Sequence, residues 1–283
     1  MSATGATRAR DSGSMHAFAS HWPEYLIEAW ALGTFMLLAC AVSVALLHVE
    51  SPLRAWIGDG IASRFVGGLA MGATAIALIT SPWGKRSGAH LNPAVTLTFL
   101  RLGRIRAADA VGYVVAQCIG GAAGVAVARV LFGEAVAAHP VRYAATLPGV
   151  WGVGGAFAGE SLIAFVMMAM VLTTTRVPRL APYTGHLAGV LVCVFITFES
   201  PLSGMSMNPA RTIASALHAD AWRGAWLYLA APLLGMHLAA TWLGRSRSGC
   251  AKLVHCPRVR CIFCGHEPCA SSTTAAAVSP RTS

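Results

Sequence analysis

A repeated tripeptide is the first feature of this chain that could act on a ligand. Its copies are Asn92-Pro93-Ala94 and Asn208-Pro209-Ala210, and each opens an apolar stretch too short to cross a bilayer. Asn is a favoured N-cap and Pro is tolerated at the first helical position, so each copy predicts a helix that begins there. The repetition indicates an inverted pair of short helices that meet inside a membrane. Such an arrangement is typical of a pore.

Three charged residues in apolar surroundings are the second such feature. Arg211 follows the second tripeptide directly, and Glu28 and Glu160 each lie early in an apolar stretch. An ionised side chain inside a membrane is costly, so it usually serves a function. Arg211 could contact a solute, or it could form a structural salt bridge. The two carboxylates could couple an ion to transport.

The end of the chain carries a third candidate, a group of cysteines with His255 and His266 among them. Cys261 and Cys264 have the two-residue spacing of a metal-ligand pair, and together with Cys256 and Cys269 they could hold zinc. The complete spacing matches no common zinc module. A reduced tail without a metal is the alternative, and both interpretations remain open.

The composition indicates which elements position these residues. The chain has 283 residues, of which 55% are hydrophobic and only 11% charged, and its mean hydropathy is +0.60. Apolar runs of about 20 residues, enough to cross roughly 30 Å of hydrocarbon, recur along it. We predict six membrane spans, at Tyr25–Val49, Ile61–Ser81, Ala107–Phe132, Val153–Thr175, Leu180–Phe198 and Ala221–Leu243.

The spans fall into two halves of the same pattern. Each half reads as span, span, short helix, span, and three spans per half require the second half to cross the membrane in the opposite sense. The short helices are predicted at Pro93–Leu102 and Pro209–Leu217, each roughly 14 Å long, about half the hydrocarbon thickness. The loops before them, Ser81–Leu91 and Glu199–Met207, are therefore expected to re-enter the membrane. Such backbone must be buried in protein or line a wet cavity.

The basic residues predict the orientation. The net charge is +10, and most of the 21 Lys and Arg residues lie on the side of the N-terminus in this topology. The positive-inside rule then places both termini in the cytoplasm of a multi-pass protein, expected in the cell (inner) membrane. No motif supports nucleic-acid binding. The expected organisation is an N-terminal tail (1–21), a channel domain (22–244, with halves of about 22–132 and 153–244) and a Cys/His-containing C-terminal tail (245–283).

Four segments resemble the aquaporin, or major intrinsic protein, family: Glu28–Met36, Ser87–Thr96, Gly112–Gln117 and Asn208–Arg211. The resemblance covers about residues 22–244. It implies an all-α membrane fold with six transmembrane helices and two re-entrant half-helices in an inverted repeat. It also implies that each monomer forms its own pore and that four monomers assemble as a homotetramer.

The resemblance assigns roles to the residues singled out above. Asn92 and Asn208 would turn their amide NH₂ groups toward passing molecules while local backbone donors hold their side-chain oxygens. The two helix dipoles would repel cations and protons at the same place. Glu28 and Glu160 would accept hydrogen bonds from the re-entrant loops, and His90 would be structural or line the pore.

The resemblance also implies a selectivity filter. Arg211 would form it with Ile196, Met205 and a residue of the second span, either Met71 or Gly72. Water-selective members place a His where Ile196 stands, and glycerol-conducting members use an aromatic pair that is missing here. Thr212 and Ala216 resemble the water-selective branch, as Tyr228 does, whereas Leu229 resembles the glycerol branch. The filter therefore predicts water and one or more small neutral solutes, with glycerol, urea, ammonia and peroxide unresolved.

We expect a passive channel, embedded in the lipid bilayer, that excludes ions and protons and needs no cofactor apart from the zinc considered for the tail. Two alternatives belong to other classes: an ion-coupled secondary transporter with inverted repeats, and a membrane-anchored metal or redox sensor that acts through the tail. An enzyme is not expected, because no nucleophile–base or carboxylate pair lies near a plausible site.

Overall fold

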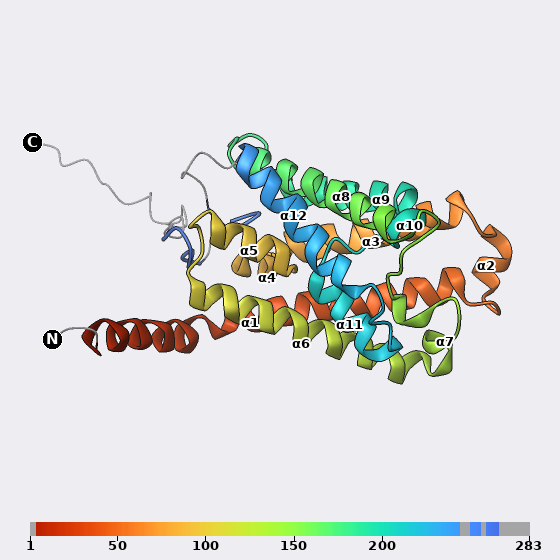
Figure 1. Ribbon diagram of the computed structural model, residues 1–283, viewed down its shortest axis with the longest axis horizontal. Helices are drawn as coiled ribbons and strands as arrows, with labels where there is room; N and C mark the ends of the chain where they lie inside the picture. The colour runs from red at the N-terminus through yellow and green to blue at the C-terminus, as the bar shows by residue number, and fades with distance from the viewer. Residues whose placement is uncertain (1–3, 244–249, 256–258, 266–283) are drawn as a thin grey trace, which may run out of the picture.

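The protein is a bundle of helices that run roughly parallel to one long axis (Figure 1). A computed structural model describes residues 4–243, 250–255 and 259–265, and within these ranges all regular structure is helical. Six of the described helices contain segments long and apolar enough to cross a membrane. They are α1 (Thr4–Leu47), α3 (Ile61–Thr80), α6 (Ala107–Phe132), α8 (Gly152–Thr174), α9 (Thr184–Phe198) and α12 (Ala225–Leu243).

The predicted spans are confirmed, and most of their ends agree closely with the helices. The largest difference is at the N-terminus, where α1 begins at Thr4 and has no break near residue 22. The expected boundary between an N-terminal tail and the channel domain is therefore not a break in secondary structure.

Two short helices lie between the long ones, as the Asn-Pro pairs predict. They are α5 (Pro93–Arg101) and α11 (Pro209–Ala219). Short helical turns complete the connections, and their few residues give too little periodicity for sequence to reveal them. These turns are α2 (Pro52–Ile57), α4 (Pro82–Ser87), α7 (Glu134–Ala137), η1 (Arg142–Ala144), η2 (Ala181–Tyr183) and α10 (Ser200–Ser203).

Glycines allow equivalent helices of the two halves to pack backbone against backbone. A Cβ on Gly120 of α6 would overlap the backbone of Ala29 in α1, and one on Gly235 of α12 would overlap that of Ser161 in α8. Between the halves, a Cβ on Gly72 of α3 would lie 2.5 Å from the carbonyl oxygen of Gly189 in α9. Small residues at such contacts let helices approach closely in lipid.

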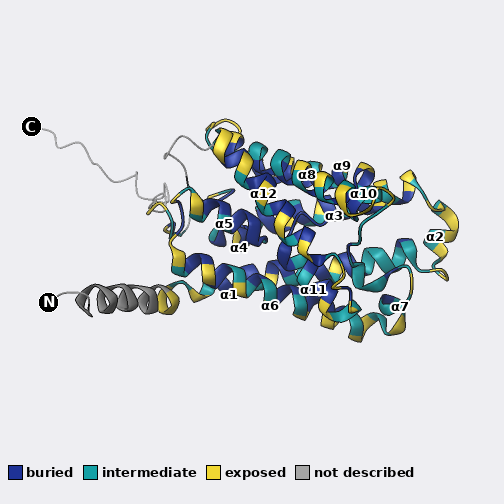
Figure 2. Cartoon of the chain, viewed as in Figure 1, coloured by how far each residue is buried: buried dark blue, intermediate teal, exposed yellow. Residues whose placement is uncertain are grey.

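The surface of the bundle suits a bilayer. Buried residues line its interior and exposed ones its periphery (Figure 2), and many exposed residues are large and apolar, Leu26, Val115, Ile119 and Leu162 among them. Large exposed apolar surface is typical of lipid contact rather than of a soluble monomer. We call the end of the bundle that carries residues 250–265 the tail end (left in Figure 1), and the end with α2 and α7 the far end.

Candidate functional site

Each Asn-Pro-Ala copy caps a half-helix, as predicted. The Asn92 side-chain oxygen accepts a hydrogen bond from the backbone N–H of Ala94 at 2.8 Å. The Asn208 oxygen accepts from the N–H groups of Ala210 at 3.1 Å and Arg211 at 3.3 Å. Pro93 and Pro209 occupy the first helical positions, where their missing N–H leaves no bond unmade.

The two caps also hold each other. Nδ2 of Asn92 donates to the carbonyl oxygen of Met207 at 2.8 Å, and Nδ2 of Asn208 donates to that of Leu91 at 2.7 Å. This crosswise pair refines the expectation that both amides simply face the lumen. An NH₂ group has two N–H donors, so each amide ties the opposite loop with one and keeps one. Both Asn residues line the central cavity.

Glu28 organises the first re-entrant loop. Its carboxylate accepts hydrogen bonds from the backbone N–H groups of His90 at 3.0 Å and Leu91 at 2.7 Å. The Ser87 hydroxyl and the Gln117 amide also donate to it, at 2.8 and 2.9 Å. Glu28 is completely buried, and a buried carboxylate is tolerated where donors surround it. Its role in supporting the loop is therefore visible in its contacts.

Glu160 does the same for the second loop. It accepts from the backbone N–H groups of Ser206 and Met207, both at 2.6 Å, and from the Ser203 hydroxyl at 2.7 Å. These bonds hold a backbone in which Met205 and Met207 both have φ of 54°, a conformation that side chains with a Cβ adopt at a cost.

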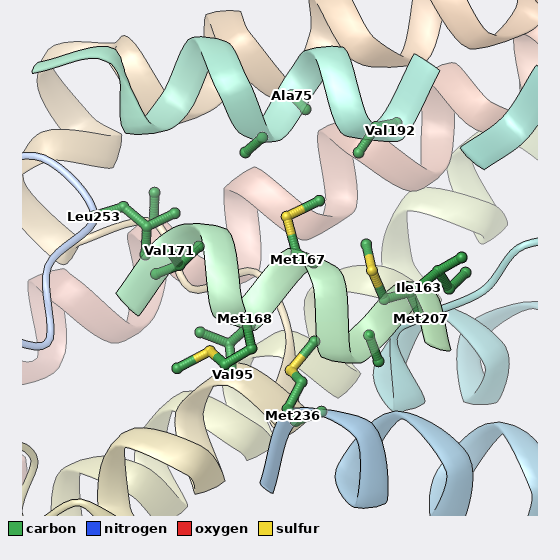
Figure 3. Packing of buried hydrophobic residues seen from close by; sticks show 14 of the residues in the cluster. Ala75, Val95, Ile163, Met167, Met168, Val171, Val192, Met207, Met236 and Leu253 are labelled. Carbon is green, nitrogen blue, oxygen red and sulfur yellow. The ribbon is translucent and has the colours of Figure 1, made fainter. Parts of the chain in front are cut away.

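A cavity of about 510 Å³ runs through the bundle and is lined by both re-entrant loops. Its wall also includes residues of α1, α3, α8 and α9, from Asp59 and Arg64 at the far end to Ile79 and Val171 toward the tail end. Around it packs a core rich in methionine, of which Figure 3 shows Met167, Met168, Met207 and Met236. The cavity passes the starts of both half-helices and extends toward both ends of the bundle, as a conduction path requires.

Arg211 lies on the cavity wall one residue after the second tripeptide. Its Nη1 is buried and has no hydrogen-bond partner among the described residues. None of the ion pairs among those residues includes it either. The structural salt bridge weighed for Arg211 is therefore not formed within the described part of the chain, and a donor remains for a solute.

The other filter candidates are partly placed as expected. Ile196 and Met205 line the cavity, and so does Met71, whereas Gly72 packs against α9. Met71 lies about one helical turn nearer the tail end than Ile196. Its neighbour Gly72 contacts Gly189 and Cys193 of α9, which precede Ile196. Counting back from the tripeptide does not allow for the six residues of α4, which lie between α3 and the motif.

The cavity-lining residue of α3 at the level of Ile196 is Gly67. The neighbouring Gly68 packs against Cys193 and Thr197, and Arg64 donates from Nε to the carbonyl oxygen of Thr197 at 3.0 Å. Arg64 and Gly67 both line the cavity. Sequence reasoning missed both, because the depth of a residue in α3 is set by helix packing rather than by its distance from a motif.

His90 is both structural and cavity-lining. Its Nδ1 lies 3.0 Å from the Thr96 hydroxyl of α5, and its Nε2 lies 2.7 Å from the carbonyl oxygen of Ala251. Its ring stacks on Phe99 and on Phe263, with centroids 5.1 and 5.8 Å away. His90 therefore connects the first half-helix to the C-terminal segment.

The metal ligands considered for the tail are only partly among the described residues. Cys256 and Cys269 lie outside them. Cys261 and Cys264 instead share a cluster with Cys250 and His255, whose ligand atoms all lie within 4.8 Å of one another. A hydrogen bond from the Cys250 thiol lowers the pKa of Cys261.

Known proteins resemble the chain over most of its length. The sequence model of the family described as Major intrinsic protein matches residues 17–242. Aquaporin NIP1-3 of Oryza sativa subsp. japonica is 32% identical over 82% of this chain and 79% of its own length. The glycerol uptake facilitator protein-like 6 of Lactiplantibacillus plantarum is 34% identical over 77% of this chain and 94% of its own.

A solved structure shares the fold. The X-ray structure of the aquaglyceroporin from Plasmodium falciparum matches with a TM-score of 0.66 at 19% sequence identity. The match covers 80% of this chain and 96% of the chain in that structure. Family channels are not enzymes and need no cofactor, and the likeness supports passive conduction rather than either alternative class. The chain therefore belongs to the major intrinsic protein family, and it is a multi-pass membrane channel through which water and small neutral solutes pass without coupling to an energy source.

Proposed function

We propose that this channel conducts neutral solutes larger than water, such as glycerol and urea, and that it excludes ions and protons. The narrowest level of the pore is assigned to Gly67, Ile196, Met205 and Arg211, which replaces the choice between Met71 and Gly72. The observation that carries the proposal is Gly67. Helix α3 packs against α9 and contributes no side chain at this level, where a Cβ on Gly67 would lie 3.2 Å from Cδ1 of Leu46, another residue of the cavity wall. The lumen there is therefore wider than with a bulky residue.

The chemistry of this ring suits small polyols and amides. Ile196 and Met205 offer an apolar wall, and a thioether side chain can adjust its shape. Arg211 offers donors that can bind a hydroxyl or carbonyl oxygen. A solute with a hydrocarbon side and a polar side can satisfy both walls at once. The same Arg and the two half-helix N-termini place positive potential in the path of cations and protons.

The relatives point in the same direction. One of them is named as a glycerol uptake facilitator-like protein, and we extend that solute class to this chain. By likeness to the family we also propose a homotetramer in the cell (inner) membrane. The tail end would face the cytoplasm, because most basic residues outside the spans lie at that end.

Gly67→Phe tests the filter in proteoliposomes. The added ring would begin beside Leu46 of α1, which lines the same part of the cavity. It should therefore narrow the lumen and lower glycerol permeability several-fold more than water permeability. Leu69→Phe is the matched control, because Leu69 lies on the same helix and is 57% exposed on the outer surface. Equal losses for water and glycerol, or no loss, would contradict the assignment of Gly67.

A further inference from the structure

Four side chains of the C-terminal segment converge as the ligands of one metal ion would. Sγ of Cys250 lies 3.4 Å from Sγ of Cys261, and Nε2 of His255 lies 3.4 Å from Sγ of Cys264. All four atoms lie within 4.8 Å of one another. A tetrahedral zinc with Zn–S bonds of about 2.3 Å places neighbouring sulfurs roughly 3.8 Å apart. The cluster therefore has the size of a tetrahedral site.

The backbone around the sulfurs is already arranged for ligation. The N–H of Gly265 donates to the carbonyl oxygen of Cys261 at 2.9 Å and closes a turn around the two-residue Cys spacing. Gly265 has φ of 69°, which glycine adopts without strain. The backbone nitrogen of Lys252 lies 3.5 Å from the Cys250 sulfur. Such outer contacts orient metal ligands.

The same segment is fixed to the first re-entrant loop. The N–H of Leu253 donates to the carbonyl oxygen of Gly88 at 3.2 Å, and Nζ of Lys252 donates to that of Arg86. The carbonyl oxygen of Ala251 lies 2.7 Å from Nε2 of His90 and can accept a hydrogen bond from it. A Cβ on Gly88 would lie 3.1 Å from the Cα of Lys252. The segment therefore packs directly on the loop that precedes Asn92.

Two apolar side chains carry this contact into the pore. Phe263, which lies between Cys261 and Cys264, stacks on His90 with an angle of 10° between the rings. Leu253 is only 6% exposed and lines the cavity together with Ile79, Ala89 and Val171. In Figure 3, Leu253 lies at the edge of the buried cluster near Val171. Leu253 thus covers the tail end of the conduction path.

We propose that Cys250, His255, Cys261 and Cys264 bind one Zn²⁺, and that the ion holds residues 250–255 and 259–265 over the tail-end mouth, so that zinc lowers the flux. The effect of zinc on flux rests on the proposed channel function, whereas zinc binding does not depend on it. Three thiolates and an imidazole suit Zn²⁺ among the common divalent ions. A Cys250–Cys261 disulfide would use two of the four groups and leave the convergence of His255 and Cys264 unexplained.

A metal also accounts for how so short a segment can hold its shape. Its described residues form no helix or strand, and a few buried side chains such as Ala251 and Leu253 make a small core. Segments of this size usually need a metal or a covalent link to stay folded. Metal binding then supplies the folding free energy of the segment.

Metal content of the full-length protein in detergent is the first test. We expect one zinc per chain, and Co²⁺ in its place should give the thiolate-to-metal absorption of a tetrahedral site. Both signals should disappear in Cys261→Ser/Cys264→Ser and persist in Cys118→Ser, a control inside the bundle. They should also persist in Cys256→Ser/Cys269→Ser. Loss in that last variant, no stoichiometric zinc, or recovery of a Cys250–Cys261 disulfide would overturn the assigned ligand set.

Flux through reconstituted protein is the second test. A membrane-permeant zinc chelator should raise the solute permeability of the zinc-loaded wild type several-fold, and should change nothing in Cys261→Ser/Cys264→Ser. Leu253→Ala should keep its zinc yet conduct as fast as the chelated protein. If zinc is bound but chelation leaves flux unchanged, the closing role is wrong. If no form conducts, the channel function fails while the metal result still stands.

Discussion

The two re-entrant segments, residues 81–101 and 199–219, share one scaffold and differ in what surrounds it. In both, a buried Glu accepts from two loop N–H groups and a Ser hydroxyl, and a Tyr hydroxyl donates to the carbonyl oxygen of that Ser at 2.6 Å. The first segment carries His90 and Val95, where the second carries Ser206 and Arg211. The first is covered by residues 251–253 of the C-terminal segment. The second is covered by residues 146–150 of the connection between the halves, where the N–H of Gly149 donates to the carbonyl oxygen of Leu202 at 2.7 Å.

This difference separates two kinds of residue. Positions that are equal in the two halves build the midplane, because each half needs the same hydrogen bonds to hold non-helical backbone inside a membrane. Positions that differ are those to which we assign selectivity and control. In our proposal, Arg211 and the ring around it set selectivity at the far end, and the C-terminal segment packed on His90 controls flux at the tail end.

Removal of either scaffold Glu should have the largest effect. Glu28→Ala and Glu160→Ala each orphan at least three buried donors, at about 1–3 kcal/mol per group. Both variants should lose most of their folded yield, as measured by thermal unfolding and gel filtration in detergent. Glu134→Ala is the control, because Glu134 is exposed. If one scaffold variant folds normally, the two halves are not equivalent in stability.

Replacement of Arg211 by the residue at the equivalent position of the first half should remove the difference between the two re-entrant segments. Arg211→Val gives the second half the residue that the first half has at Val95. Loss of the cation should raise solute flux several-fold and permit a proton leak, since one positive barrier is gone. Proton flux is measured with a pH-sensitive dye inside vesicles. If the proton permeability and the range of conducted solutes were unchanged, Arg211 would not be part of the filter.

A substitution of Ile196, another residue of the proposed filter, should change the range of conducted solutes. Ile196→His adds a polar ring that narrows the lumen and offers a hydrogen bond. Glycerol and urea permeability should fall several-fold while water permeability is largely kept, as measured by light scattering from vesicles. Val194→His, a lipid-facing substitution on the same helix, should leave all three unchanged. Solute uptake that is the same in both variants would show that Ile196 does not set the range.

The smallest expected effect is at the paired tyrosines. Tyr113→Phe and Tyr228→Phe each remove one buried hydrogen bond, worth about 1 kcal/mol, so each should lower Tm by about 2–4 °C. The two decreases should be similar, because both hydroxyls bond the carbonyl oxygen of the scaffold Ser. A decrease of Tm in only one variant would indicate that the tyrosine hydrogen bond stabilises the two halves unequally.

The sequence predicts the architecture and the midplane well, for physical reasons. Membrane spans follow from hydropathy alone, and Asn-Pro fixes a helix start because few other positions tolerate that pair. The level of Gly67 is not predictable by counting, because the six residues of α4 lie between α3 and the motif. The cluster around Cys261 is also hidden, since Cys250 and His255 are brought to it by chain folding rather than by spacing.

Stopped-flow light scattering from proteoliposomes of the unmodified chain, first freed of zinc, tests the central claim most directly. A glycerol or urea gradient should cause fast shrinkage through water efflux, followed by re-swelling as the solute enters through the open filter. Shrinkage without re-swelling would contradict a pore that admits solutes larger than water. No response beyond that of empty vesicles would contradict conduction by these two half-helices altogether.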